Sequence, residues 1–400
     1  MKRILILGAS IFQIPVVKQA KKMNLFVGIV DISREAPAIP YADVYFQCSI
    51  KDAEAVLKIA KEFKPNAICV GICDSAMNTA AILCEKLGLP GTSVSVAKCA
   101  TDKYEMIKAF DKYDVPHPKY CLVKKNEIEH QDVDLKYPLI SKPTDSAGSK
   151  GICVIDNKTH LYDSLKESSK AGTSGDVLVE EMMNGREVSV ELIVEDGVPF
   201  AAQVTDKLTT GAPHFIEIGH AQPSTLSDEK VELIKKVACQ AAIAVGLQNS
   251  IAHAELFLTS EGPKMVEIAG RLGGGGIAEQ LIVLSTGINM AELTISYSLG
   301  MENQHPKPSF NRASVSRFIL SKDGVVESID GIEDARKIPG VTEVSLFFKN
   351  GDKFHDAVDN SGRIGYVIAT ANKQEDAVKI CEEAINKIIV SYKKCEVNES

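Results

Sequence analysis

The sequence predicts a multidomain protein with α/β and α+β parts, and three observations support this fold class. The chain has 400 residues, more than one hydrophobic core usually organises, so two to three domains are expected. Hydrophobic residues make up 45% of the chain and charged residues 24%, as in globular proteins. Strand-like and helix-like segments alternate over about the first hundred residues, and several strand-like segments precede one final helix at the other end.

Charge and hydropathy exclude several classes of protein. The 45 basic and 53 acidic residues give a net charge of −8, which opposes a broad binding surface for nucleic acid or for an anionic membrane. No apolar stretch approaches the length of about 18 residues that crosses a bilayer, and the apolar run after Lys2 and Arg3 is too short for a signal peptide. The 10 cysteines are scattered, so reduced thiols and a cytoplasmic location are expected.

The first part of the chain is predicted to be a Rossmann-like sheet. Its expected strands are residues 3–7, 25–31 and 67–70, and its expected helices are residues 14–23, 52–63 and 76–87. Gly8 and Asp31 have the spacing of a dinucleotide site, but Ser10 and Gln13 stand where that motif needs glycine. We therefore favour a tight turn between strand and helix, and leave open a contact of this turn with a small carboxylate substrate.

Two lysines and a loop of small residues form the next candidate site. A helix is expected at residues 104–113, capped by Thr101 or Asp102. Lys103 lies at the N-terminus of this helix, where its positive charge opposes the helix dipole unless it faces an anion. A solvated lysine is the alternative. Lys142 ends an apolar strand, residues 137–143, and the backbone amides of the loop that follows could fold over phosphates. The loop includes Ser146, Ala147, Gly148, Ser149 and Gly151.

Acidic residues accompany the next two expected strands, residues 177–181 and 187–193. An adenosine ligand needs a backbone donor and acceptor for its base and a carboxylate for its ribose, which these strands and their connector could supply. Simple exposure to solvent is the alternative for Glu180, Glu181 and Glu187.

Two glutamates are predicted to face each other in a hairpin. Strand-like segments at residues 252–258 and 264–268 are joined by turn residues, and their pairing places Glu255 opposite Glu267. Because facing like charges are unfavourable, a divalent cation between them is expected. Arg271 follows four residues after Glu267, just before a run of four glycines.

The two lysines, the loop of small residues, the acidic strands, the facing glutamates and Arg271 occur in an order and spacing that resemble those of ATP-grasp carboxylate-amine ligases. The resemblance is greatest to the L-amino acid ligase branch, which makes dipeptides. The resemblance covers nearly the whole chain. It implies a Rossmann-like domain at residues 1–98, a two-part ATP-grasp fold at residues 99–305 with its lid at about residues 115–178, and a small α+β domain at residues 306–400. We expect the last domain to pack on the ATP-grasp core and to help close the substrate cleft or a homodimer interface.

The resemblance also implies roles for individual residues. Lys103 and Lys142 would bind the phosphates of ATP, residues 146–151 would form the lid over them, and residues 180–183, including Met183, would hold adenine. Glu187 would bind the ribose, Glu255 and Glu267 would bind Mg²⁺ or Mn²⁺, and Arg271 would stabilise the transferred phosphoryl group. Ala269 stands where the family commonly has an asparagine ligand, which leaves the coordination of a second metal ion open.

The implied substrates are a small-molecule carboxylate and an amine. The segments at residues 204–207, 211–224 and 271–276 are most similar to those of amino-acid ligases, so the acceptor pocket would include His214, Glu217, His220, Arg271, Gly274 and Gly275. A structural role is the alternative for the two histidines and Glu217. Two other functions stay open: an ATP-grasp enzyme of nucleotide biosynthesis or carboxylation, and a nucleotide-binding protein without catalysis.

The C-terminal part contains no catalytic constellation of its own. We expect strands at residues 313–320, 325–329, 341–348 and 364–370, then a helix at residues 372–390 with Asn372 and Glu375 at capping-box spacing, and finally a frayed polar tail at residues 393–400.

Overall fold

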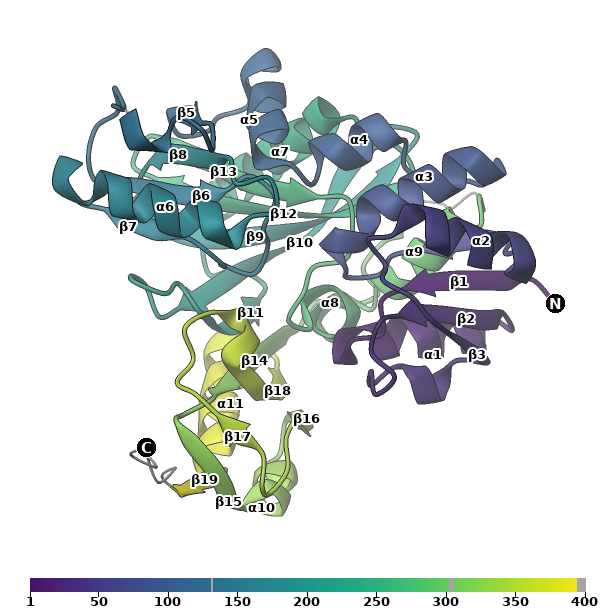
Figure 1. Cartoon of the computed structure of the whole chain (residues 1–400). Helices are drawn as coiled ribbons and strands as arrows, with labels where there is room; N and C mark the ends of the chain where they lie inside the picture. Colours follow the sequence, from purple (N-terminus) through teal and green to yellow (C-terminus); the bar gives the residue numbers. More distant parts are fainter. Residues whose placement is uncertain (131, 302–305, 394–400) are drawn as a thin grey trace, which may run out of the picture.

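The computed structural model describes residues 1–130, 132–301 and 306–393. These residues form four β-sheets: a four-stranded sheet near the N-terminus, a second four-stranded sheet, a central eight-stranded sheet and a three-stranded sheet near the C-terminus. Figure 1 shows the N-terminal sheet on one side of the central strands β9, β10 and β12, and the second four-stranded sheet on the other. The mixed α/β fold with several domains is therefore confirmed.

The N-terminal sheet has the strand order β3-β2-β1-β4, and all its neighbouring strands are parallel. Its strands are β1 (Arg3–Leu7), β2 (Phe26–Asp31), β3 (Val44–Gln47) and β4 (Ala67–Cys69), and its helices are α1 (Ile14–Lys22), α2 (Ala53–Phe63) and α3 (Met77–Leu87). Helix α9 (Met290–Ser298) also packs on α1 and β4, although it lies far along the chain.

The turn after β1 is held by Asp31. Its Oδ2 atom accepts a hydrogen bond of 2.8 Å from the Ala9 amide, and Gly8 has a φ of +94°. The carboxylate that a dinucleotide site would use for ribose is thus engaged with the turn itself. This contact favours the interpretation of the segment as a strand-to-helix turn.

The second four-stranded sheet is antiparallel, with the strand order β5-β8-β6-β7. Its strands are β5 (Tyr120–Val123), β6 (Leu139–Pro143), β7 (Cys153–Ile155) and β8 (Val177–Glu181), and helix α6 (Leu161–Ala171) packs on β6 and β7. It occupies the segment that the resemblance assigns to the lid. The loop between β6 and β7 carries the predicted phosphate-binding residues.

The eight-stranded sheet is antiparallel and has the strand order β13-β12-β9-β10-β11-β14-β18-β16. Its first five strands are β13 (Gly262–Ala269), β12 (Ser250–Thr259), β9 (Arg186–Glu195), β10 (Val198–Thr209) and β11 (Glu217–Gln222). Helix α7 (Asp228–Val245) packs on β9, β10, β12 and β13. Helix α5 (Lys103–Lys112) packs on α7, and the short helix α4 (Val94–Cys99) packs on α5. Strand β9 is buried along most of its length because neighbouring elements cover both of its faces.

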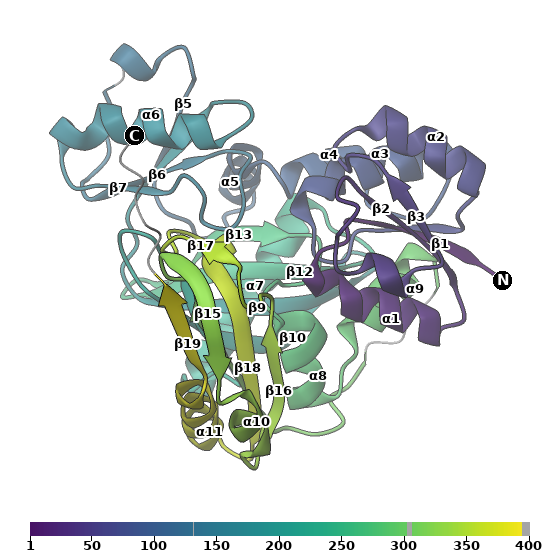
Figure 2. The ribbon, with the colours of Figure 1, turned by 60° about the horizontal axis from the view of Figure 1, so that its bottom comes forward.

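The C-terminal part extends the same sheet through β14 (Ala313–Leu320), β18 (Arg363–Ala371) and β16 (Val341–Leu346). Figure 2 shows β18 and β16 beside the smaller sheet, which contains β17 (Lys353–Phe354), β15 (Gly324–Asp330) and β19 (Ile389–Lys393). Helix α11 (Gln374–Lys387) packs on β14 and β18, α10 (Ile332–Lys337) packs on α11, and α8 (Ile282–Thr286) contacts β14.

Two details of the C-terminal prediction are wrong. The last helix ends at Lys387, and Ile389 begins strand β19, because these residues pair with β15 rather than continue the helix. The helix is capped at Lys373 with no hydrogen bond from the capping side chain, so Asn372 and Glu375 do not form the expected box. The predicted tail from residue 394 onward lies outside the described residues.

The sequence predicts no membrane-spanning segment and reduced cysteines. None of their helices has the length and apolar character needed to span a membrane. The cysteines among them are free thiols.

Candidate functional site

A cleft of about 540 Å³ lies between the second four-stranded sheet and strands β9 to β13. It brings together most of the predicted nucleotide and metal residues: Lys103, Lys142, Ser146, Ala147, Gly148, Ser149, Glu180, Glu181, Met183, Glu187, Glu255 and Glu267. Gly151 is not part of this lining. A Cβ atom at Gly151 would lie 2.4 Å from the Cβ atom of Ala171, so its glycine is required where the loop packs on α6.

Lys103 is the first residue of α5 and points into the cleft. Asp102 caps the helix by accepting hydrogen bonds from the amides of Tyr104 and Glu105. The Lys103 Nζ atom lies 3.1 Å from Glu267 Oε2 and donates to the Ser146 carbonyl at 2.6 Å. Burial opposes its charge, but Glu267 raises the pKa of Lys103 above its ordinary value. The lysine thus links the helix, the loop and the hairpin glutamate.

Lys142 lies on β6 and pairs with Glu180 on the neighbouring strand β8. Their Nζ and Oε2 atoms are 2.7 Å apart, and the two side chains are only 5% and 6% exposed. Glu181 turns the other way, and its Oε1 atom accepts a hydrogen bond from the Lys136 amide at 3.1 Å. The side chain of Glu180 is therefore engaged with Lys142, whereas Met183 follows in the connector that lines the cleft.

The hairpin of β12 and β13 places Glu255 opposite Glu267, as predicted. The register depends on a bulge: Thr259 pairs with Gly262 and Leu256 with Met265, but the next pair is Glu255 with Glu267, so Val266 is the extra residue. Without this bulge, Glu255 would face Val266. An irregularity of one residue therefore brings the two carboxylates together.

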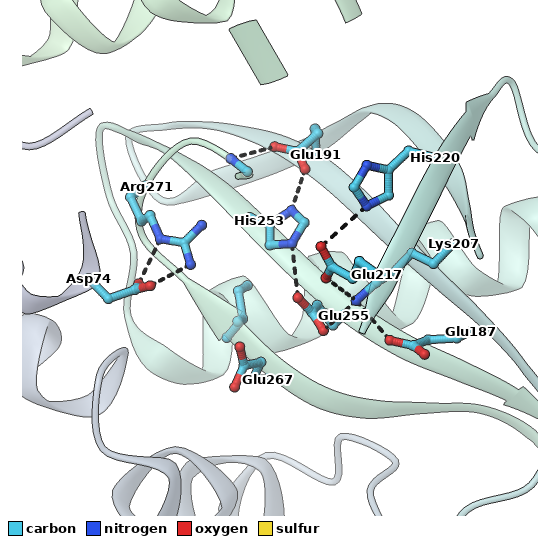
Figure 3. Close-up of polar contacts among 12 residues, drawn as sticks. Asp74, Glu187, Glu191, Lys207, Glu217, His220, His253, Glu255, Glu267 and Arg271 are labelled. Atoms are coloured by element: carbon cyan, nitrogen blue, oxygen red, sulfur yellow. Dashed lines mark hydrogen bonds and ion pairs between the residues drawn. The ribbon is translucent and has the colours of Figure 1, made fainter. Parts of the chain in front are cut away.

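Lys207 on β10 contacts three carboxylates at once. Its Nζ atom lies 2.7 Å from Glu187 Oε1, 3.0 Å from Glu217 Oε1 and 2.8 Å from Glu255 Oε2, and the side chain is 3% exposed (Figure 3). Burial alone would lower the pKa of Lys207, but the carboxylates raise it well above its ordinary value. The sequence placed Lys207 in a segment similar to amino-acid ligases but gave it no role. It is the central cation of the site.

A buried histidine, His253, bridges Glu255 and Glu191. The Nδ1 atom of His253 bonds Glu191 Oε1, and the Nε2 atom lies 3.2 Å from Glu255 Oε1 (Figure 3). Both ring nitrogens therefore act as donors to carboxylates. Burial alone would lower the pKa of His253, but Glu191 and Glu255 raise it to about 10.

Arg271, unlike the two lysines and the two hairpin glutamates, is not part of the cleft lining and contacts the N-terminal part of the chain. Its Nε and Nη2 atoms each lie 2.6 Å from an oxygen of Asp74, which forms a bidentate pair. The next residue, Leu272, donates its amide to the Gly71 carbonyl at 3.1 Å. Burial opposes the charge, but Asp74 raises the pKa of Arg271 above its ordinary value. These contacts fix the start of the glycine-rich loop, residues 273–276.

The predicted acceptor residues divide into two groups. Glu217 lines the cleft and contacts Lys207 and Arg363, whose Nη1 atom lies 2.8 Å from Glu217 Oε2. His220 is fully buried, with its Nε2 atom 3.4 Å from Glu217 Oε2 and its ring against Phe318, and burial lowers its pKa. His214 is exposed on the loop before β11 and is not part of the cleft lining, so its role stays a prediction.

The glycine-rich loop lies beside this group. A Cβ atom at Gly275, whose φ is +63°, would meet His220 at 2.9 Å and Arg363 at 3.3 Å. Gly274 is the neighbouring member of the loop, and a Cβ atom there would meet nothing closer than Ile72 at 3.8 Å. Arg363 comes from β18, and Asn360, which precedes it, accepts a hydrogen bond from the Glu217 amide at 2.9 Å. The C-terminal part therefore contributes to the site, although the sequence indicated no constellation there.

The donor set fits a divalent cation only together with a ligand. Within residues 1–130, 132–301 and 306–393, no three His, Cys, Asp or Glu side chains are grouped so that they could hold a metal by themselves. Glu255 and Glu267 supply carboxylate oxygens, whereas Ala269 supplies none. Magnesium commonly binds to one or two carboxylates and completes its shell with phosphates and water. Glu255 and Glu267 suit that arrangement.

Comparisons with known proteins agree with this site. Residues 135–279 match the ATP-grasp domain family, and residues 317–393 match L-amino acid ligase C-terminal domain 2. Alanine–anticapsin ligase from Bacillus subtilis is 30% identical over 266 residues, which are 60% of this chain and 56% of the relative, so the chain spans little more than half the length of that protein. Formate-dependent phosphoribosylglycinamide formyltransferase from Sulfurisphaera tokodaii is 25% identical over 98% of this chain and 97% of its own length.

A solved structure has the same overall fold. The L-amino acid ligase from Bacillus licheniformis superimposes with a TM-score of 0.85 at 21% identity, over 98% of this chain and 99% of that one. At 21% identity this similarity shows the fold, and the two domain matches show the family. The chain belongs to the ATP-grasp carboxylate-amine ligases and carries a C-terminal domain of the L-amino acid ligase type.

Proposed function

We propose that this protein uses ATP to activate the carboxylate of an amino acid and couples it to an amine, with release of ADP and phosphate. The observation that carries the proposal is the convergence of Lys103, Lys142, Glu255 and Glu267 on one cleft. Two cations and two facing carboxylates are the groups needed to hold a triphosphate and its metal ion.

The nucleotide would lie between the two sheets. Lys103 and Lys142 would bind phosphate oxygens, residues 146–150 would cover them, and the connector with Met183 would contact the adenine. Glu187 would bind the ribose in place of its present contact with Lys207. Glu255 and Glu267 would hold Mg²⁺, which when bound neutralises charge on the phosphates.

The reaction needs two substitutions. An oxygen of the substrate carboxylate attacks the γ-phosphorus, the bond to the bridging oxygen breaks, and ADP leaves. The amine then attacks the acyl carbon, phosphate leaves, and the amine nitrogen gives up a proton. Arg271, held in place by Asp74, would balance the charge on the transferred group, and closure of residues 146–150 would keep water from the acyl phosphate.

The amino-acid branch is favoured by the C-terminal domain and by the charges near it. Arg363 comes from the C-terminal domain, and it is already paired with Glu217. A sugar-phosphate substrate would need further free cations to bind its phosphate. The whole-length similarity to a phosphoribosylglycinamide formyltransferase nevertheless makes formate with a sugar-phosphate amine the second candidate pair.

Release of ADP and phosphate over a panel of substrates tests this proposal. The panel contains each amino acid alone, amino acids in pairs, and formate with a glycinamide ribonucleotide. We expect release only with amino acids, and dipeptide in the products by mass spectrometry. Release only with formate and the ribonucleotide would transfer the assignment to the second candidate, and tight ATP binding without release from any mixture would contradict both.

A further inference from the structure

His253 lies behind the metal-binding carboxylate rather than in the cleft. It stands on β12 directly opposite Glu191 on β9, and both side chains are buried. Glu255 lies two residues further along β12, so its side chain leaves the same face of the sheet. Lys207 and Glu255 line the cleft, whereas His253 and Glu191 are not part of that lining. The histidine therefore supports the site from outside it.

The two oxygens of Glu255 have separate partners. Oε1 lies 3.2 Å from His253 Nε2, and Oε2 lies 2.8 Å from Lys207 Nζ (Figure 3). The contact with His253 fixes the carboxylate from its buried side. The other oxygen, Oε2, contacts Lys207, which lines the cleft.

Glu191 extends this contact to the glycine-rich loop. Its Oε1 atom bonds His253, and its Oε2 atom accepts a hydrogen bond of 3.2 Å from the Gly273 amide. A Cβ atom at Gly273 would lie 2.4 Å from Glu191 Oε1 and 2.7 Å from His253 Nδ1. The loop is thus seated on the pair so closely that only glycine fits there.

We propose that His253 is a positioning residue that, together with Glu191, fixes the position of the metal-binding carboxylate Glu255 relative to the glycine-rich loop. The inference rests on the proposed function, because it takes Glu255 as a metal ligand. Glu255 contacts His253, His253 contacts Glu191, and Glu191 accepts a hydrogen bond from the Gly273 amide. These contacts connect the carboxylate that would hold the metal ion to the loop beside Glu217 and His220. Partners of this kind commonly change metal affinity by about 10- to 100-fold when they are removed.

The test measures metal binding directly. Mn²⁺ is titrated into the protein in the presence of ADP and the free ion is followed by electron paramagnetic resonance, for the wild type and for Glu191→Gln, His253→Gln and the double variant. Glu191→Gln keeps the shape of the side chain, so it should fold even if a change at His253 does not; circular dichroism and thermal unfolding check this. His117→Gln is the matched control, because His117 is also largely buried and paired with an acid, Asp111, at 3.1 Å.

We expect each single variant to bind Mn²⁺ about 10- to 100-fold more weakly with ADP present, the double variant to be little worse than either single, and His117→Gln to match the wild type. Amide exchange of a peptide covering residues 271–277 should be faster in Glu191→Gln. Folded variants with wild-type Mn²⁺ affinity, or losses that simply add in the double variant, would overturn the inference and leave the proposed function intact. A wild-type protein that binds no Mn²⁺ with ADP would overturn the proposed function itself.

Discussion

The proposed function assigns one group of residues to the nucleotide and another to the substrate, called here the nucleotide end and the substrate end, and the two groups are built in different ways. At the nucleotide end, Lys142 pairs with Glu180 within one small sheet, and Glu255 faces Glu267 within one hairpin. At the substrate end, Arg271 pairs with Asp74 across 197 residues and Glu217 with Arg363 across 146. The nucleotide end is therefore nearly complete within the ATP-grasp part, whereas the substrate end needs all three parts of the chain to be docked.

The two ends also differ in how their charges are balanced. At the nucleotide end, Lys103 and Lys142 each have a carboxylate within 3.1 Å. Just after the glycine-rich loop, Glu279 is 8% exposed, and its Oε2 atom has no hydrogen-bond partner among the described residues. Substitutions at the nucleotide end should therefore affect binding of the nucleotide and its metal ion, whereas substitutions at the substrate end should affect catalysis, specificity or pH dependence.

The largest effect is expected from Arg271→Met. Loss of the cation that would stabilise the transferred phosphoryl group should lower kcat by about 10³-fold or more, while ADP affinity stays unchanged because Arg271 lies outside the nucleotide end. Steady-state kinetics and ADP titration measure both. Asp74→Asn should give a smaller loss of kcat, since it disturbs only the orientation of Arg271; equal ADP-binding losses in both variants would show that the two ends are not separable.

Lys207→Met should destabilise the ligand-free protein by about 3–5 kcal/mol, because Glu187, Glu217 and Glu255 would lose their shared cation. Denaturant unfolding measures this loss. Mg²⁺ with ADP should restore more stability to the variant than to the wild type, since a divalent cation would replace the missing charge. Lys235→Met, on the surface of α7 beside Glu232, serves as the control and should change stability by less than about 1 kcal/mol; a similar small change in Lys207→Met would contradict the role given to Lys207.

Glu279→Gln tests the buried acid that follows the glycine-rich loop. Burial, together with Glu191 and Glu343, raises the pKa of Glu279 to about 8 from an ordinary value of 4.5. Between these two pH values the unfolded chain releases the proton and the folded protein keeps it, so wild-type stability should fall as pH rises through this window. Between pH 5 and pH 8, the free energy of unfolding of the wild type should fall by an amount on the order of 3 kcal/mol. Glu279→Gln should remove this fall, and denaturant unfolding at the two pH values measures it. The exposed control Glu229→Gln should keep the wild-type slope, and an unchanged slope in Glu279→Gln would contradict the assignment.

The smallest effect is expected from Arg363→Gln. Arg363 contacts Glu217, the Asn360 carbonyl, the Phe318 ring and the glycine-rich loop. Because the proposal assigns this group to the substrate, the KM of the acceptor amine should rise about tenfold, equal to about 1.4 kcal/mol, while the KM of ATP stays constant. Initial rates with each substrate varied in turn measure the two constants. Arg336→Gln, at an exposed pair on α10, should alter neither constant. A parallel rise in the KM of ATP would mean that the C-terminal domain supports both ends of the cleft.

Local patterns were enough to predict much of the fold and of the nucleotide end. Alternating strands and helices predicted three of the four strands of the N-terminal sheet. A cap at Thr101 or Asp102 predicted the start of α5 to within one residue, and spacing around one turn predicted the Glu255–Glu267 pair. These features depend on residues that are close in sequence or paired across one turn. The bulge at Val266 was not foreseen, although the predicted pair depends on it.

The remaining contacts depend on which strands lie next to each other. Lys207 reaches its carboxylates because β10 lies between β9 and β11, and Arg363 reaches Glu217 because β14 joins the C-terminal strands to β11. No local signal in the sequence gives that order. His253 is an exception: its place two residues before Glu255 in a predicted strand puts both on one face, so this spacing could have indicated it.

The paired cations at the nucleotide end have one more consequence. Lys103, Lys142 and Lys207 are all engaged with acids of the protein itself, so an incoming triphosphate must take them from Glu267, Glu180 and Glu255. A nucleotide that arrives without its metal ion would leave those freed acids facing its own negative charge. The cleft should therefore discriminate against bare ATP and admit the nucleotide only together with a counter-ion.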